Sequence, residues 1–296
     1  MFSDIILKRN SEKARKYRDS GEYDKALEIY LRLIGKNHDL LNNYFNIGVL
    51  FSDKQDFDKA LYYFDKALSL DTNNIHVLVQ KGLVFYGMKK FDDALSVFNK
   101  VLKIDPENQY ALMNKGLVFL EICKFNEALN LFEKCLDNDP ENYSLWLFKA
   151  HALNGLNHFK EALESLNISL KFYPKNMSAL LKKGIILDRV GCYDEALDVY
   201  YKCLKLDSKH VGVLNNVGEV YYHKKEYNKA LEYYDKALTL ESENAIILFN
   251  MARVSSDLKN YDESLKYYDK ALKLNPNDEY SLKGREEVLK KIKNNN

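Results

Sequence analysis

Residues 22–30 read EYDKALEIY, and close variants of this nonapeptide return seven more times along the chain. Each variant begins 34 residues after the previous one, without an insertion or a deletion. The other copies are DFDKALYYF at 56–64, KFDDALSVF at 90–98, KFNEALNLF at 124–132, HFKEALESL at 158–166, CYDEALDVY at 192–200, EYNKALEYY at 226–234 and NYDESLKYY at 260–268. A chain of 296 residues would ordinarily suggest two domains. A fixed period instead predicts units that stack around one continuous core.

Two apolar series within each copy predict a pair of helices. If the first residue of a copy is called phase 1, the copies begin at residues 7, 41, 75, 109, 143, 177, 211 and 245. In the copy that begins at 41, the first series occupies phases 4, 7, 8 and 11, and the second occupies phases 17, 20, 21, 24, 27 and 28. Both series follow the spacing of one helix face, and no segment alternates with period two. The sequence therefore predicts an all-α chain.

Turn-forming residues recur between the predicted helices. Each proline of the chain occupies phase 32, where it ends a second helix because it lacks an N–H. Gly21 and Gly191, at phase 15, are suited to a left-handed conformation at the end of a first helix. Good N-cap residues stand at phase 34 before a new first helix. These predicted caps are Asn74, Asn108, Asn142, Asn176, Asn244 and Asp278.

Small residues predict how the paired helices meet. Glycine inside a helix costs about 1 kcal/mol relative to alanine, so its repetition at phase 8 needs a compensating gain. Alanine stands at phase 20 of the second helix in all copies but the last. We therefore expect each phase-8 glycine to meet the phase-20 alanine of its own copy. The glycines are Gly48, Gly82, Gly116, Gly184 and Gly218.

The combined pattern resembles the tetratricopeptide repeat (TPR). Small residues at phases 8 and 20, aromatic residues at phases 11, 17 and 24, and proline at phase 32 are typical of that family. Trp146 stands where the family's signature tryptophan belongs, and the resemblance covers residues 7–278. It implies a right-handed superhelical solenoid in which first helices line a concave groove. We expect an eight-repeat TPR solenoid over 1–278 and a polar C-terminal capping helix and tail over 279–296.

The resemblance also implies a non-enzymatic scaffold that binds a peptide or protein segment in the groove. Side-chain amides at phase 6 can pair with the backbone of an extended peptide. An apolar strip at phases 5 and 9, extended by Tyr86, can contact an amphipathic segment. The alternative interpretation is that neighbouring copies bury this strip as ordinary core. The predicted site comprises Phe45, Asn46, Val49, Val79, Gln80, Leu83, Tyr86, Met113, Asn114, Leu117, Leu147, Asn216 and Asn250.

Other functions find little support in the sequence. The Lys/Asn pair with which chaperone-adaptor relatives grip a carboxylate is absent at phases 5 and 9. A net charge of +1 argues against nucleic acid as a partner. We expect no metal, no cofactor, no catalytic residue and no membrane segment, four structural cysteines, and a cytoplasmic location. The sequence leaves two alternatives open, an RNA-binding helical-repeat protein and a self-associating, homo-oligomeric TPR protein.

Overall fold

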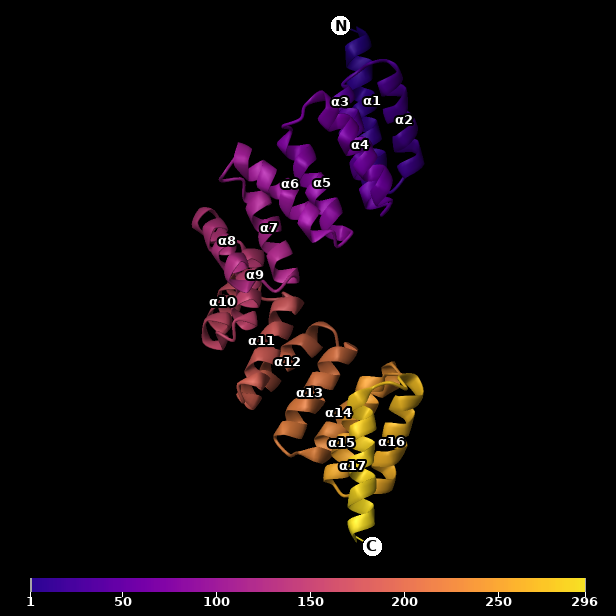
Figure 1. Ribbon diagram of the computed structural model, residues 1–296, viewed down its shortest axis with the longest axis vertical. Helices are drawn as coiled ribbons and strands as arrows, with labels where there is room; N and C mark the ends of the chain where they lie inside the picture. The colour runs from indigo at the N-terminus through magenta and orange to yellow at the C-terminus, as the bar shows by residue number, and fades with distance from the viewer. Residues whose placement is uncertain (1, 296) are drawn as a thin grey trace. The chain divides into compact units, whose positions relative to one another are not determined.

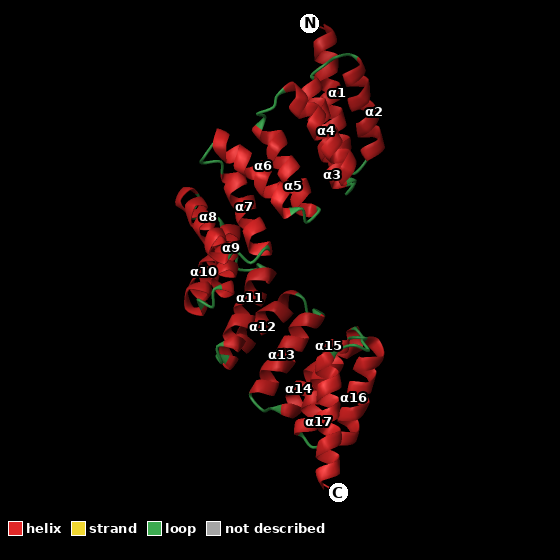
Figure 2. Cartoon of the chain, in the orientation of Figure 1, coloured by secondary structure: helices red, strands yellow, loops and turns green. Residues whose placement is uncertain are grey.

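The computed structural model describes residues 2–295, and its regular elements in this range are all α-helices (Figures 1 and 2). Two helices fall within each predicted copy, and α17 follows the eighth pair. Odd-numbered helices up to α15 are first helices, and even-numbered ones are second helices. The bounds are α1 (Phe2–Asp19), α2 (Tyr23–Gly35), α3 (Leu40–Asp53), α4 (Phe57–Leu70), α5 (Ile75–Gly87), α6 (Phe91–Ile104), α7 (Gln109–Glu121), α8 (Phe125–Asn138), α9 (Tyr143–Gly155), α10 (Phe159–Phe172), α11 (Met177–Arg189), α12 (Tyr193–Leu206), α13 (Val211–His223), α14 (Tyr227–Leu240), α15 (Ala245–Asp257), α16 (Tyr261–Leu274) and α17 (Glu279–Asn295).

The helices form two compact units. Unit 1 extends to Asn157 and contains α1–α9, and unit 2 begins at His158 and contains α10–α17. Each unit has its own clusters of buried apolar side chains, formed between neighbouring helices. The fully buried side chains include the phase-24 rings Tyr30, Phe64, Phe98, Phe132, Tyr200 and Tyr234.

The predicted N-caps are confirmed. The side-chain oxygen of Asn108 accepts a hydrogen bond from the backbone N–H of Ala111 at 3.0 Å, which satisfies a donor that the first turn of α7 leaves free. Its amide nitrogen in turn donates to Asp105 at 3.0 Å, so the acidic residue at phase 31 holds the cap in place. The same cap-to-backbone bond is made by Asn74, Asn142, Asn176, Asn244 and Asp278.

The turns between paired helices adopt a left-handed residue at phase 15 in every copy. Gly21 and Gly191 have φ values of 79° and 82°, as the sequence predicts. The other six copies use residues with a Cβ in this conformation, with φ between 57° and 64°. These residues are Gln55, Lys89, Cys123, Asn157, Lys225 and Lys259.

The atoms nearest to the phase-8 glycines belong to an aromatic ring, a contact that the sequence analysis did not predict. A Cβ placed on Gly48 would lie 2.5 Å from the ring of Phe64, and one placed on Gly116 would lie 2.6 Å from the ring of Phe132. The same glycine-to-ring contact occurs at Gly82, Gly184 and Gly218. Glycine recurs because an aromatic ring at phase 24, sixteen residues later, packs directly on the backbone of the first helix.

Candidate binding surface of the first helices

First helices lie along the inner side of the curve in each unit. In unit 1, α1, α3, α5, α7 and α9 contact one another in succession, and in unit 2, α11, α13, α15 and α17 do the same. Within the described residues no comparable set of contacts joins successive second helices. A row of helices that touch on one side while their partners separate on the other is curved, with the touching helices inside. Residues at equal phases of successive first helices therefore form rows across this surface.

In unit 1 these rows are largely apolar. Phe45, Val49, Leu83, Met113 and Leu117 are half-buried, each packed at its base against a core cluster. Leu147 and Gln80 are also half-buried, whereas Val79 is only 7% exposed. Most of the predicted strip thus keeps part of its side-chain surface outside the core. Val79 belongs to the core. For this residue the alternative interpretation, in which neighbouring copies bury the strip, is the correct one.

Aromatic contacts hold part of this surface in place. The ring of Phe45 lies 6.1 Å from that of Phe64 between centroids, and the ring of Tyr86 lies 6.2 Å from that of Phe91. The Tyr86 hydroxyl donates to Glu121 at 3.2 Å, which joins α5 to α7. Burial, followed by the charge of Glu121, raises the pKa of Tyr86, so this hydroxyl keeps its proton.

The amide row is mostly used inside the protein, which corrects its predicted role. Asn46 donates to the backbone carbonyl of Asn42 at 2.7 Å and accepts from Arg18 at 3.2 Å. Asn114 is 8% exposed and donates to the backbone carbonyl of Tyr110 at 2.8 Å.

The two amides in unit 2 also have partners within the protein. Asn216 is half-buried and hydrogen-bonds to the Tyr200 hydroxyl. Asn250 is 4% exposed and donates to Asn215 at 3.0 Å. Asn114 and Asn250 are therefore structural residues rather than free donors for a peptide.

A crevice opens beside the apolar rows between the N-terminal ends of α7 and α9. Its volume is about 390 Å³, and the end of α8 contributes to its wall. Tyr110 stands beside it with 69% of its surface exposed. The lining residues are Gln109, Tyr110, Met113, Cys135, Asp139, Asn142 and Leu145. One predicted site residue, Met113, therefore lies in a real depression.

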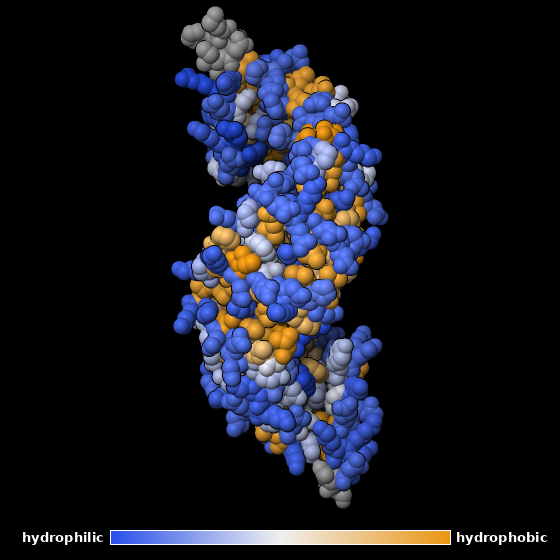
Figure 3. Space-filling view, turned by 90° about the vertical axis from the view of Figure 1, so that its left-hand side faces the viewer, coloured by the Kyte–Doolittle hydropathy of each residue, from blue (hydrophilic) through white to orange (hydrophobic). Residues whose placement is uncertain are grey.

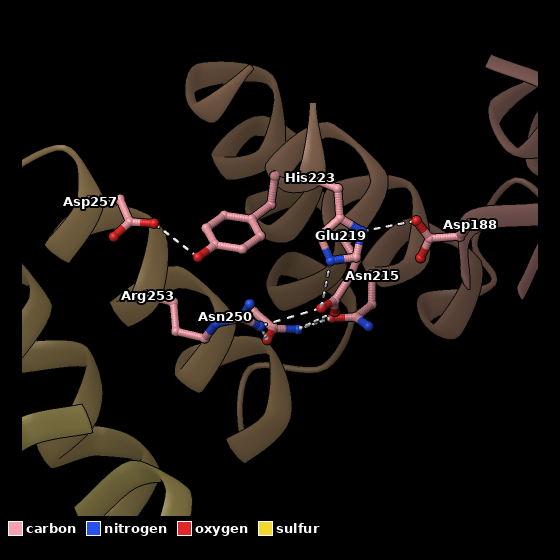
Figure 4. A network of polar contacts seen from close by, with 8 residues as sticks. Asp188, Asn215, Glu219, His223, Asn250, Arg253 and Asp257 are labelled. Carbon is pink, nitrogen blue, oxygen red and sulfur yellow. Dashed lines mark hydrogen bonds and ion pairs between the residues drawn. The ribbon is translucent and has the colours of Figure 1, made fainter. Parts of the chain in front are cut away.

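In unit 2 a connected polar network covers the first helices (Figure 4). His223 on α13 bonds to Asp188 on α11 at 2.9 Å. Glu219, also on α13, accepts from Arg253 on α15 at 3.3 Å. The guanidinium of Arg253 also lies 4.4 Å from the centroid of the Tyr222 ring. The network joins three successive first helices.

The sequence analysis missed this network, although a signal for it exists. Asp188 and His223 are 35 residues apart, as are Tyr222 and Asp257, whose hydroxyl-to-carboxylate bond is 2.8 Å long. A complementary polar pair separated by one repeat plus one residue places its members on adjacent first helices. Burial raises the pKa of Asp188, and the bond to His223 opposes that effect.

The face drawn in Figure 3 is mostly hydrophilic, with hydrophobic residues in scattered patches. Among the described residues, no three His, Cys, Asp or Glu side chains are grouped so that they could hold a metal ion. None of the helices in the described range combines the length and the apolar character needed to cross a membrane.

Paired helices at a fixed period, with a curved row of first helices, define a helical-repeat scaffold. The chain belongs to the tetratricopeptide-repeat family. Tetratricopeptide-repeat models match residues 21–73, 124–183, 178–210, 212–244 and 245–278. A model described as anaphase-promoting complex, cyclosome, subunit 3 matches residues 53–135. Comparison with curated protein sequences gives no match.

Solved structures share the fold. A tetratricopeptide repeat protein from Parabacteroides merdae is 19% identical with a TM-score of 0.64, over 84% of this chain and 98% of that one. A chain in the structure described as the APC/C hetero-tetramer Cut9-Hcn1 is 16% identical with a TM-score of 0.65, over 90% of this chain and 52% of that one. YrrB, described as a TPR protein with an unusual peptide-binding site, is 26% identical with a TM-score of 0.53, over 62% of this chain and 95% of that one. Proteins of this family are generally non-enzymatic scaffolds for protein interactions.

Proposed function

We propose that the protein binds a peptide or protein segment on the first-helix surface of unit 1. The observation that carries this proposal is the row of half-buried apolar side chains on α3, α5, α7 and α9. Contiguous apolar surface on a folded chain commonly marks an interaction site. At the same phases of the last two repeats, unit 2 has Asn215, Glu219, Phe249 and Arg253, and three of these take part in its internal network.

The similar structures support the same class of function. YrrB, which is 26% identical over 62% of this chain, is described as having a peptide-binding site. Another structure of similar fold is described as the APC/C hetero-tetramer Cut9-Hcn1, so a chain of this fold occurs in an assembly of proteins. The segment bound by this chain is expected to be amphipathic, since the unit 1 rows offer apolar contacts to one side of it.

A charge introduced into the apolar rows tests the proposal. We expect Leu83→Asp combined with Leu117→Asp to retain the helical circular-dichroism spectrum, because both side chains are only half-buried. The double variant is expected to lose the partners that the parent chain captures from native-host lysate, identified by mass spectrometry. A matched control is Leu70→Asp combined with Ile104→Asp, two exposed apolar residues at the ends of second helices in the same unit. Equal capture by the row variant and the parent would contradict the proposal.

A further inference from the structure

The crevice between α7 and α9 has smaller counterparts at equivalent positions in later repeats. Two of them lie between α13 and α15 and between α15 and α17, each with a volume of about 170 Å³. Both are lined at phase 2 of the following helix by a large side chain, Ile246 in one and Tyr280 in the other. In α9 the residue at that phase is Ser144. At this phase the chain therefore has a smaller residue beside the α7–α9 crevice than beside the two crevices in unit 2.

The walls of this crevice suit a large apolar side chain. Met113 and Leu145 line it, and the ring of Tyr110 stands at its side, 69% exposed. An exposed aromatic ring beside an apolar depression offers contact area without loss of many side-chain rotamers. Deep pockets that take one aromatic or aliphatic anchor contribute much of the binding energy in protein interfaces.

The edge of the crevice is acidic. Asp139 lines it, Asp137 lies in the last turn of α8, and Glu141 lies on the connection between α8 and α9; all three are exposed. In the part of the chain that the structure describes, no basic side chain forms an ion pair with any of them, whereas nearby Glu107 pairs with Lys134 at 2.8 Å. Three exposed carboxylates without an ion pair, of which Asp139 accepts a hydrogen bond from Asn142 at 2.9 Å, favour a partner with positive charge next to its apolar group.

The geometry points to an anchor site: the α7–α9 crevice receives a large apolar side chain of a partner segment, and Asp137, Asp139 and Glu141 attract lysine or arginine residues that flank it. This inference rests on the proposed function and adds the chemistry of the partner. It places the strongest contact at one end of the apolar rows, where Met113 belongs to both the row and the crevice.

Trp146 provides a direct readout. It is the only tryptophan in the chain, it follows Leu145 of the crevice wall, and its indole N–H donates to the carbonyl of Pro140 at 2.8 Å. Three synthetic peptides without tryptophan serve as probes, each with a Phe-Ile-Phe core flanked on both sides by two lysines, two glutamates or two serines. Binding is followed by Trp146 emission and by calorimetry in 50 mM NaCl, and again in 300 mM.

We expect the lysine-flanked peptide to bind about tenfold more tightly than the glutamate-flanked one in low salt, and the difference to shrink in high salt. Ser144→Tyr reproduces the residue type found at Tyr280 and is expected to weaken the lysine-flanked peptide about tenfold or more. Ser144→Ala is the control that keeps the crevice open. Asp137→Lys combined with Glu141→Lys is expected to remove the preference for lysine flanks, while the Phe-Ile-Phe core of the peptides still binds the crevice.

The outcomes separate this inference from the proposed function. Equal binding of the lysine and glutamate peptides, or no binding of any of the three, overturns the inferred partner chemistry. Unchanged binding by Ser144→Tyr overturns the crevice as the anchor, even if Leu83→Asp with Leu117→Asp still abolishes capture of native partners. If that row variant keeps its native partners while Ser144→Tyr loses the lysine-flanked peptide, the proposed function fails and the anchor site stands.

Discussion

At the scale of single residues, the left-handed turns show where the repeat is under local strain. Every first helix up to α15 is followed by a phase-15 residue at positive φ, but only Gly21 and Gly191 lack the Cβ that makes this conformation unfavourable. Lys89 and Lys225 hold φ values of 57° and 59° with long side chains. The surrounding helix pairs impose this conformation, because the turn must close before the second helix can pack on the first.

Replacing such a lysine by glycine is expected to stabilise the protein. Lys89→Gly and Lys225→Gly each remove the left-handed penalty of about 1–2 kcal/mol, less the 0.4–1 kcal/mol that glycine costs through the unfolded chain. The expected gain is roughly 0.5–1 kcal/mol for each variant, measured from urea unfolding curves. Lys202→Gly, at an exposed position inside α12, is the control and should lose about 1 kcal/mol. A loss of stability at Lys89 and Lys225 as well would contradict the strain argument.

At the scale of the helix, periodicity predicted nearly everything that depends on one chain segment. Apolar spacing gave each helix pair, and the cap residues at phase 34 gave the start of the first helices, because both depend on neighbours within a few residues. Contacts between helices were harder to predict. Gly116 was assigned to an alanine because alanine and phenylalanine both lie on the apolar face of α8, and only the crossing of the helices decides that Phe132 is the one in contact.

The candidate site was predictable only in outline. Family resemblance indicated the first helices as the surface, and the apolar character of Leu83, Met113 and Leu117 could be read directly. The role of Asn114 could not be predicted, because its side-chain amide donates to the backbone carbonyl of Tyr110, one helical turn earlier. The crevice was also missed, since its lining combines residues of α7, α8 and α9, and only the packing of these helices brings them together.

Two buried thiols on second helices make stability depend on pH in the alkaline range. Burial raises the pKa of both Cys135 on α8 and Cys203 on α12 from 9.0 to about 11. The folded state therefore favours the neutral thiol. The contribution of the neutral thiols to the free energy of unfolding is complete below pH 9 and is lost as the pH rises from 9 towards 11. Each thiol can account for a loss on the order of 2–3 kcal/mol.

Removing both thiols is expected to flatten this dependence. The free energy of unfolding of Cys135→Ala with Cys203→Ala should fall less between pH 7.5 and pH 10.5 than that of the parent chain. Alanine is suitable because Ala67, Ala237 and Ala271 occupy the same phase and are buried. Cys123→Ser with Cys192→Ser changes the two exposed cysteines and should follow the parent curve. Parallel curves for all three proteins would show that burial of the thiols does not control the alkaline loss.

At the scale of the whole molecule, the first copy differs from the later ones at a first-helix position that all later copies bury. Phase 10 of the first helix is apolar and no more than 2% exposed from the second copy through to α17; its residues are Leu50, Val84, Val118, Ala152, Ile186, Val220, Val254 and Val288. In the first copy this phase is Lys16, which is exposed, and phase 3 is Arg9, also exposed. Polar outer faces of this kind keep repeat arrays soluble, because an apolar face would bind the end of another copy.

Arg9→Val combined with Lys16→Val is therefore expected to promote self-association. The substitutions recreate on α1 the apolar face that a preceding repeat covers elsewhere in the array. A contact between unlike ends does not close on itself, so the expected result is a scattering mass that keeps rising with concentration. Lys8→Val combined with Arg15→Val removes the same charges from exposed positions at phases 2 and 9 of α1 and should leave the mass at the parent value. If both double variants associate equally, loss of charge rather than exposure of a repeat interface is the cause, and the role assigned to Arg9 and Lys16 is wrong.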